Sequence, residues 1–299
     1  MKPSAAAVNS SGWPPPPGFA THGDWLTAEW IATALTAARG RGLDVHLQPI
    51  VTADNGRLVA CEALSRMTPC APSQLPPKQF LAVAAQAGML DDVTWMVIEH
   101  AAADARTLAE HGFPIPVTLN ISAVSFDNPE LIQRLMNTLE RYELPPSALI
   151  LEITERAPFV DPEAACDIVA RLTTHGFCVA LDDYGIGYSD AARLTSLSVG
   201  IVKIDRSTVR EHRQPARRRE LDDLLRVAAD RELITIAEGV ESAADAVAMT
   251  ALGVDWLQGF WTAPAMPVAD FLTWAHGQPD TRPDLADHDL VTPRFLTAT

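Results

Sequence analysis

The chain has 299 residues, of which 47% are hydrophobic and 20% charged, so it can bury a large core while its length leaves the number of domains open. Its formal net charge of −15 argues against binding long nucleic acid, which depends on basic patches, but a small anionic ligand stays possible. No apolar stretch approaches the roughly 18 to 20 residues that cross a bilayer, and the four cysteines are widely spread. We therefore expect a cytoplasmic protein without direct membrane insertion.

Short β-branched runs alternate with longer segments of helical periodicity from residue 45 onward. We predict strands over residues 45–51, 57–66, 116–122, 148–154, 177–184, 200–206, 234–240 and, more weakly, 255–259. Predicted helices cover residues 25–40, 92–111, 129–142, 162–175, 218–229 and 243–252. This alternation is typical of parallel β/α architecture.

The first two predicted strands are separated only by Ala53-Asp54-Asn55-Gly56, which is too short for a helical crossover and typical of a hairpin. The first strand should therefore run antiparallel, and the fold class is α/β, a TIM-like (β/α)8 barrel with an antiparallel first strand. We expect residues 1–22 to be a disordered proline-rich tail, residues 23–277 to form the barrel, and residues 278–299 to be a flexible C-terminal tail.

Polar residues stand at the ends of most of these strands, which is where the active site of a β/α barrel forms. They are Glu62, Asn120, Glu152 with Glu155, Asp182 with Asp183, Lys203 with Asp205, Glu238 with Glu241, and Gln258. Burying an unpaired charge costs several kcal/mol, so this many carboxylates in apolar runs call for a compensating cation. The sequence therefore predicts a divalent metal site.

Carboxylates with an amide oxygen suit hard ions such as Mg²⁺ or Mn²⁺, and the adjacent Asp182 and Asp183 can reach two ions. Two such ions favour phosphoryl hydrolysis, with Lys203 and Arg66 adding positive charge for a phosphodiester. Simpler interpretations exist. A single acidic residue at a strand end can be a helix cap or surface ion pair, and Lys203 can merely pair with Asp205.

Two further segments suggest structural features outside the acidic strand ends. Residues 182–189 contain two glycines directly after the acidic pair, which indicates a mobile active-site loop, and Glu155 stands where it can hold that loop. Arg210, Arg213 and residues 217–219 form a basic run before a predicted helix. That run is most simply a solvated face, with contact to an acidic partner as the alternative.

Taken in order, these residues resemble the EAL-domain family of cyclic di-GMP phosphodiesterases, over roughly residues 25–275. The motifs are Gln48-Pro49-Ile50, Glu62-Ala63-Leu64, Asn120-Ile121-Ser122, Glu152-Ile153-Thr154-Glu155, Asp182-Asp183-Tyr184-Gly185, Lys203-Ile204-Asp205, Ala237-Glu238-Gly239-Val240-Glu241 and Gln258-Gly259-Phe260. The resemblance implies a barrel with an antiparallel first strand and hydrolysis of cyclic di-GMP to linear pGpG, which lowers the level of this bacterial second messenger.

The resemblance also implies roles for individual residues. One metal ion would be held by Glu62, Asn120, Glu152 and Asp182, and a second by Asp182, Asp183 and Glu238. Lys203 would position or polarise the attacking water, with Glu238 as a general base and Glu62 also counted among the catalytic residues. Substrate-binding positions would be Gln48, Leu64, Arg66, Asp205, Glu241 and Gln258. A homodimer and an unidentified protein regulator are further expectations.

The chain departs from the family pattern at three places: Ile186 and Asp190 in the loop after the acidic pair, Met67 after Arg66, and the segment 84–90, which lacks an acidic pair. None of these departures removes a metal ligand. They keep two alternatives open, a catalytically silent receptor for cyclic di-GMP and a protein-interaction module that ignores nucleotide.

Overall fold

The computed structural model describes residues 42–67, 77–154, 162–184 and 197–278. These divide into two compact units, one from the described parts of Met1–Val45 and Ser65–Val97, the other from those of His46–Leu64 and Ile98–Thr299. The predicted helix at 25–40, the N-terminal tail and nearly all of the C-terminal tail lie outside the described residues. Within the described part, no helix is both long and apolar enough to cross a membrane.

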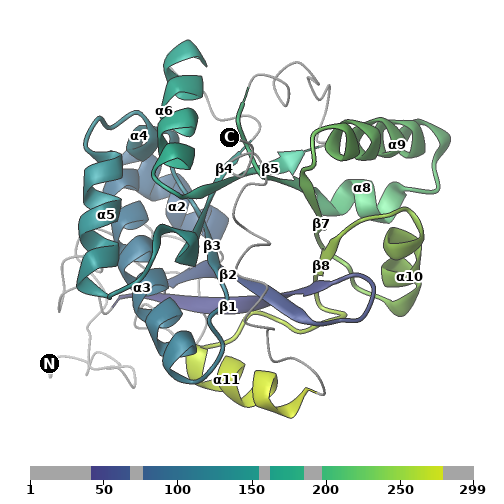
Figure 1. The fold of residues 1–299 in the computed structure, drawn as a ribbon, viewed down its shortest axis with the longest axis horizontal. Helices are drawn as coiled ribbons and strands as arrows, with labels where there is room; N and C mark the ends of the chain where they lie inside the picture. Colours follow the sequence, from purple (N-terminus) through teal and green to yellow (C-terminus); the bar gives the residue numbers. More distant parts are fainter. Residues whose placement is uncertain (1–41, 68–76, 155–161, 185–196, 279–299) are drawn as a thin grey trace, which may run out of the picture. The chain divides into compact units, whose positions relative to one another are not determined.

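The larger unit is built on a closed barrel of strands in sequence order (Figure 1). The strands are β1 (Leu43–Thr52), β2 (Leu58–Met67), β3 (Val117–Asn120), β4 (Leu149–Thr154), β5 (Cys178–Tyr184), β6 (Ile201–Ile204), β7 (Ile234–Ala237) and β8 (Trp256–Gln258). β1 pairs antiparallel with β8, with Ile50 opposite Gln258, whereas the pairs from β2–β3 to β7–β8 are parallel. The predicted barrel with an antiparallel first strand is confirmed.

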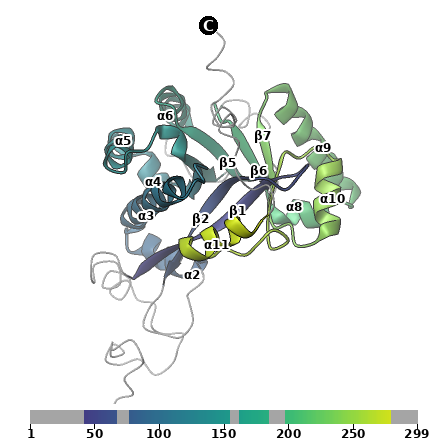
Figure 2. The ribbon, with the colours of Figure 1, turned by 60° about the horizontal axis from the view of Figure 1, so that its bottom comes forward.

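Helices follow the strands and lie outside the ring. In this unit they are α4 (Ala123–Phe126), α5 (Leu131–Arg141), the 3-10 turn η1 (Pro146–Ala148), α6 (Pro162–Thr174), α8 (Arg206–Glu211), α9 (Pro215–Asp230), α10 (Ala243–Ala251) and α11 (Val268–Gly277). Both views show α8, α9 and α10 grouped together, away from α5 and α6 (Figures 1 and 2). The amphipathic pattern explains their placement: α5 buries Leu131, Leu135 and Leu139, four residues apart.

The smaller unit contains α2 (Pro77–Gln86) and the first residues of α3 (Leu90–Glu110). Phe80, Ala84 and Val93 are buried. The indole Nε1 of Trp95 donates to Asp91 Oδ1 at 3.1 Å, one helical turn away. These contacts fix the beginning of α3.

The barrel interior is apolar toward the amino ends of the strands. Its buried cluster consists of Ile50, Val59, Ala60, Ile150, Cys178, Ala180, Ile201, Ile236 and Trp256. Because side chains alternate along a strand, Asp182 points the same way as Ala180 and Cys178, two and four residues earlier. The same spacing places Glu152 above Ile150. An apolar floor therefore lies beneath a polar layer at the carboxyl ends of the parallel strands, which we call the mouth.

Three strands end two or more residues earlier than the sequence predicted. β3 ends at Asn120, β6 at Ile204 and β7 at Ala237, whereas the predictions ran to residues 122, 206 and 240. The positions after these ends form caps and turns. Ser122 caps α4, Asp205 caps α8, and Gly239 adopts a positive φ of 61°. Asp205 and Glu238 are therefore loop residues at the mouth, not strand residues.

The helix predicted over 218–229 begins earlier, at Pro215. Proline is favoured in the first turn of a helix because its missing N–H would have no partner there. Arg217, Arg218 and Arg219 consequently lie within α9, not before it.

Candidate active site

Lys203 is the centre of the polar layer. Its side chain comes from β6, is fully buried, and reaches carboxylates from four other places around the barrel. The ammonium Nζ lies 2.7 Å from Glu238 Oε1, 2.9 Å from Glu152 Oε2, 3.3 Å from Asp182 Oδ1 and 3.5 Å from Glu62 Oε2. One positive charge therefore faces four acidic groups.

Two side-chain amides complete the ring around this lysine. Asn120 Nδ2 lies 3.1 Å from Glu152 Oε2 and 3.4 Å from Glu62 Oε1, so it bridges two carboxylates. Gln258 Nε2, on β8, donates to Glu62 Oε2 at 2.6 Å. Glu62 is thus held between β3 and β8, and neither of its oxygens faces the apolar floor unpaired.

The antiparallel first strand also contributes to this ring. Gln48 Oε1 accepts from Gln258 Nε2 at 3.3 Å, and Gln48 Nε2 donates to the carbonyl oxygen of Ala263 at 3.1 Å. No sequence pattern points to the contribution of Ala263, because any residue type can provide a backbone carbonyl. These hydrogen bonds link Ala263, Gln48, Gln258 and Glu62 in series, and they hold the Glu62 carboxylate in place within the cluster.

The electrostatic balance shows that the cluster lacks positive charge. Burial alone would lower the pKa of Lys203, but the attraction of Asp182, Glu152, Glu238 and Glu62 outweighs it and raises that pKa well above its ordinary value. Burial raises the pKa of Glu152 well above its usual range, against the opposing pull of Lys203. Burial likewise raises the pKa of Glu238 to about 8. Glu152 and Glu238 therefore keep their protons more readily than ordinary carboxyl groups. A bound cation would favour their charged forms and relieve the repulsion among the carboxylates.

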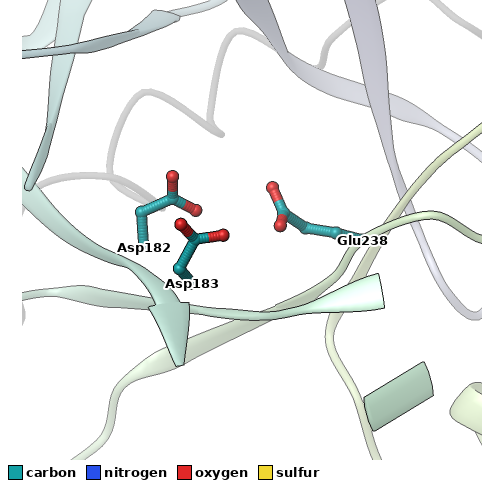
Figure 3. A group of neighbouring side chains, drawn as sticks. All are labelled: Asp182, Asp183 and Glu238. Atoms are coloured by element: carbon teal, nitrogen blue, oxygen red, sulfur yellow. The ribbon is translucent and has the colours of Figure 1, made fainter. Parts of the chain in front are cut away.

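Asp182, Asp183 and Glu238 form a second grouping at the mouth, in which one carboxylate oxygen from each lies within 4.8 Å of the others. Figure 3 shows the two aspartates side by side, facing Glu238. Adjacent residues of a regular strand point to opposite faces. Here Asp183 has a left-handed φ of 59°, and the β5–β6 register shifts between Leu181 and Tyr184, so both carboxylates reach the same side.

These residues fit a divalent cation. Glu152 Oε1 and Asp182 Oδ1 are buried and have no hydrogen-bond partner among the described residues, although Asp182 Oδ1 is in ion-pair range of Lys203. A buried acceptor without a donor is costly, and a metal ion removes that cost. Clustered carboxylates without histidine or cysteine suit hard ions. The acidic cluster can hold a metal ion.

Other predicted site residues lie elsewhere. Asp205 accepts from the backbone N–H of Ser207 at 2.8 Å and caps α8, so the ion pairs of Lys203 go to the cluster and not to Asp205. Glu241 is exposed and takes no part in those ion pairs within the described residues. Leu64 is half-buried on β2.

Arg66 belongs to the smaller unit, where its guanidinium donates to the carbonyl oxygen of Ser65 at 3.0 Å. Met67, beside it, is fully buried. Glu155, Ile186 and Asp190 fall outside the described residues. The expectations for the loop at 182–189 beyond Tyr184 therefore stay predictions.

The carboxyl ends of the strands are where the active site of a β/α barrel forms, and here they hold a buried lysine within a ring of carboxylates that can bind a metal ion. The EAL domain family model matches residues 29–265, and the chain belongs to this family.

Relatives with related sequences support the assignment. The chain is 31% identical over 241 residues to a protein of Escherichia coli named probable cyclic di-GMP phosphodiesterase PdeB, covering 80% of this chain and 46% of that protein. It is 32% identical to cyclic di-GMP phosphodiesterase PdeL of the same organism, covering 83% of this chain and 68% of PdeL. The chain spans between 30% and 62% of the length of three of the curated relatives it matches.

A solved structure described as the PaMucR phosphodiesterase in complex with c-di-GMP is similar with a TM-score of 0.75 and 31% identity, covering 81% of this chain and 97% of that one. The FimX EAL domain of Xanthomonas citri in complex with c-diGMP has a TM-score of 0.72 at 22% identity, covering 80% of this chain and 94% of that chain, which supports the fold alone.

Proposed function

We propose that this chain is a metal-dependent phosphodiesterase that hydrolyses cyclic di-GMP to linear pGpG. The observation that carries the proposal is the cluster around Lys203, where four acidic groups and two amides converge at the barrel mouth. The names of PdeB, PdeL and PaMucR support cyclic di-GMP as the substrate.

The residues divide into two candidate metal sites. Glu62, Asn120, Glu152 and Asp182 would hold one ion, with Asn120 presenting its amide oxygen after a half-turn of the amide. The grouping of Asp182, Asp183 and Glu238 would hold the other. Mg²⁺ or Mn²⁺ bound there would neutralise phosphate charge and make water a stronger nucleophile.

The chain's own side chains then position water and protons. Lys203 has three N–H donors fixed among carboxylates, and its raised pKa keeps it charged, so it can orient an attacking water and stabilise negative charge on phosphate. Burial raises the pKa of Glu238 to about 8 in the metal-free protein, so its carboxylate would accept a proton from water only once bound metal ions favour its charged form. Gln258 and Asn120 keep Glu62 in place for this chemistry.

The test is to incubate the purified protein with cyclic di-GMP and either Mg²⁺ or Mn²⁺ and to quantify pGpG by chromatography. We expect pGpG with at least one metal and none after chelation. Glu62→Gln should abolish turnover, whereas Glu110→Gln, which removes an exposed carboxylate paired with Arg106 at 2.9 Å, should leave it unchanged. Absence of pGpG with both metals would overturn the proposal.

The same preparation separates the two alternatives. Binding of cyclic di-GMP in calorimetry without any pGpG would identify a silent receptor, and no binding with or without metal would identify a protein-interaction module. The predicted homodimer is a separate proposal, which sedimentation at the assay concentration tests, with a single monomeric species counting against it.

A further inference from the structure

Residues 206–219 concentrate positive charge in a strongly acidic chain. The whole chain has 23 basic residues against 38 acidic ones. This segment alone contains six arginines and, of the acidic residues, only Glu211. The fold determines where that charge lies relative to the site.

Topology places this segment at the mouth. Arg206 opens α8 directly after Asp205, beyond the carboxyl end of β6. α9 then runs back toward the start of β7, and its 16 residues span about 24 Å, so its first turn lies at the mouth end. α8 also packs against both α9 and α10 (Figures 1 and 2).

Arg206 is next to the acidic cluster itself. A Cβ built on Gly239 would lie 2.4 Å from Arg206 Cβ, and Gly239 directly follows Glu238. The exposed guanidinium of Arg206 therefore extends from backbone that touches the edge of the site.

The six arginines differ in the ion pairs that they form with other described residues. Arg217 pairs with Glu220 at 2.8 Å and Glu211 at 3.3 Å, and Arg218 pairs with Asp222 at 2.8 Å. In the part of the chain that the structure describes, the remaining four are exposed and form no ion pair. We call them the basic rim: Arg206, Arg210, Arg213 and Arg219.

The basic rim has a local energetic cost. Arg206 and Arg210 stand four residues apart on α8, a spacing at which like charges repel. Arg206 is also the first residue of α8, where the helix dipole disfavours positive charge and no acidic residue compensates in the first turn. Folding gains nothing evident from these side chains.

We propose that the basic rim is an electrostatic guide that raises the association rate of the dianionic cyclic dinucleotide with the site, an inference that rests on the proposed function. Cyclic di-GMP carries two phosphodiesters, each with one negative charge, and a chain of net charge −15 repels it at long range. Positive charge along one edge of the mouth reverses the local field where the ligand enters.

Other anionic partners fit less well. A membrane-binding amphipathic helix has exposed apolar residues on the same helix as its basic ones, and neither α8 nor α9 exposes a large hydrophobic side chain among the described residues. An acidic protein surface stays an outcome of the test.

The guide should act in a graded way. At physiological ionic strength charges are screened beyond about 8 Å. Arg210 lies about 6 Å further along the helix axis than Arg206. Neutralising Arg206 should therefore slow association more than neutralising Arg210, and Arg219 should matter least.

The experiment measures association of a fluorescent cyclic di-GMP analogue by stopped flow, and kcat and KM for pGpG formation, over a range of salt concentrations. The rim variant is Arg206→Gln with Arg210→Gln and Arg213→Gln. Its charge-matched control is Arg106→Gln with Arg171→Gln and Arg226→Gln, near the amino ends of β3, β5 and β7. Circular dichroism verifies folding, and Arg210→Gln alone serves if the triple variant does not fold.

We expect the rim variant to lose about fivefold to tenfold in association rate and kcat/KM at low salt, with kcat unchanged and the difference vanishing at high salt. The control should match the wild type. Equal loss in both variants, or a loss that salt does not reduce, would overturn the guide. If the wild type binds nucleotide without turnover, the proposed function fails but stopped flow still tests the guide, whereas no nucleotide binding overturns both. Unchanged association together with loss of a protein partner would assign the rim to an acidic protein surface.

Discussion

Lys203 Nζ lies 2.7 Å from Glu238 Oε1, the shortest of the four ion-pair contacts that this lysine makes. The lysine comes from the interior of β6 and the glutamate from the loop after β7, so the contact joins neighbouring strands at the point where the barrel opens. It places a permanent positive charge beside an acid that retains its proton to about pH 8 without metal.

The charge balance predicts that Lys203→Met destabilises the metal-free protein. Removing one partner of a buried ionic network leaves carboxylates without compensation, so the free energy of unfolding in urea should fall by about 3 kcal/mol or more. Added Mg²⁺ should restore part of that loss, because the ion replaces the missing charge. Arg226→Met, which breaks an exposed pair with Asp223, serves as control and should change stability little. Equal stability of Lys203→Met and wild type would contradict the role assigned to the lysine.

The raised pKa of Glu238 predicts how metal-free stability depends on pH. An acid whose pKa is higher in the folded state than in the unfolded state stabilises the fold below its unfolded pKa and loses that contribution as pH rises through the folded pKa, here about 8. The raised pKa of Glu152 acts in the same direction. Stability should therefore fall between about pH 5 and 8, by up to about 1.4 kcal/mol per pH unit for each proton. Lys203, whose pKa is also raised, loses its contribution only at alkaline pH.

Urea unfolding across this pH range, with chelator and with Mg²⁺, checks the sign. Saturating Mg²⁺ should flatten or reverse the slope, since metal and proton compete for the same oxygens. Glu238→Gln removes one titrating group, so its metal-free slope should be shallower than that of the wild type. A metal-free slope that this substitution leaves unchanged would show that Glu238 does not titrate in this range.

Much of the barrel followed from the sequence because its signals are local. The four residues 53–56 allow only a hairpin, and β-branched runs with polar ends predicted both the strands and the edge where acidic residues gather. The ends of the strands were less predictable. The sequence is equally compatible with Asp205 as the last residue of β6 or as the N-cap of α8, and the structure shows that it is the N-cap.

The site's internal arrangement needed the structure. The sequence predicted that Asp182 and Asp183 can together reach two ions, although regular alternation along a strand would point them to opposite faces. The left-handed backbone at Asp183 that brings them together is seen only in the structure. From the sequence alone, Lys203 could have paired with Asp205, two residues further along the chain. The four carboxylates that surround it come from distant parts of the chain, which pairwise spacing cannot reveal.

The left-handed backbone of Asp183 allows its effect on stability to be measured separately from the effect of its charge on metal binding. Asparagine tolerates the left-handed region and alanine does not, so Asp183→Ala should be about 1 kcal/mol less stable than Asp183→Asn in the metal-free state. Both variants remove one carboxylate from the grouping with Asp182 and Glu238, and both should bind Mn²⁺ at least about tenfold more weakly in calorimetry. Wild-type Mn²⁺ affinity in both variants would remove Asp183 from the metal site, whatever their stability.

The backbone of Gly259 lies so close to that of Val240 that we expect no larger residue to fit at position 259. A Cβ at this position would lie 2.1 Å from the carbonyl oxygen and 2.4 Å from the nitrogen of Val240, both backbone atoms that cannot rotate away. Val240 N–H donates to Gln258 O at 3.0 Å, and Trp261 N–H donates to Val240 O at 2.9 Å, so this contact sets the spacing between the loop after β7 and the end of β8. That spacing also places Gln258 against Glu62.

Gly259→Ala should therefore lower the free energy of unfolding by about 3 kcal/mol and weaken Mn²⁺ binding, because the displaced Gln258 no longer holds Glu62. Gly253→Ala is the matched control. Gly253 also has a positive φ, of 85°, but an added Cβ would meet nothing within 4 Å, so its cost should be only about 1 kcal/mol with unchanged Mn²⁺ affinity. Thermal unfolding and calorimetry on both variants distinguish the two effects. Similar losses at both glycines would mean that backbone conformation alone, and not the contact with Val240, determines the cost at Gly259.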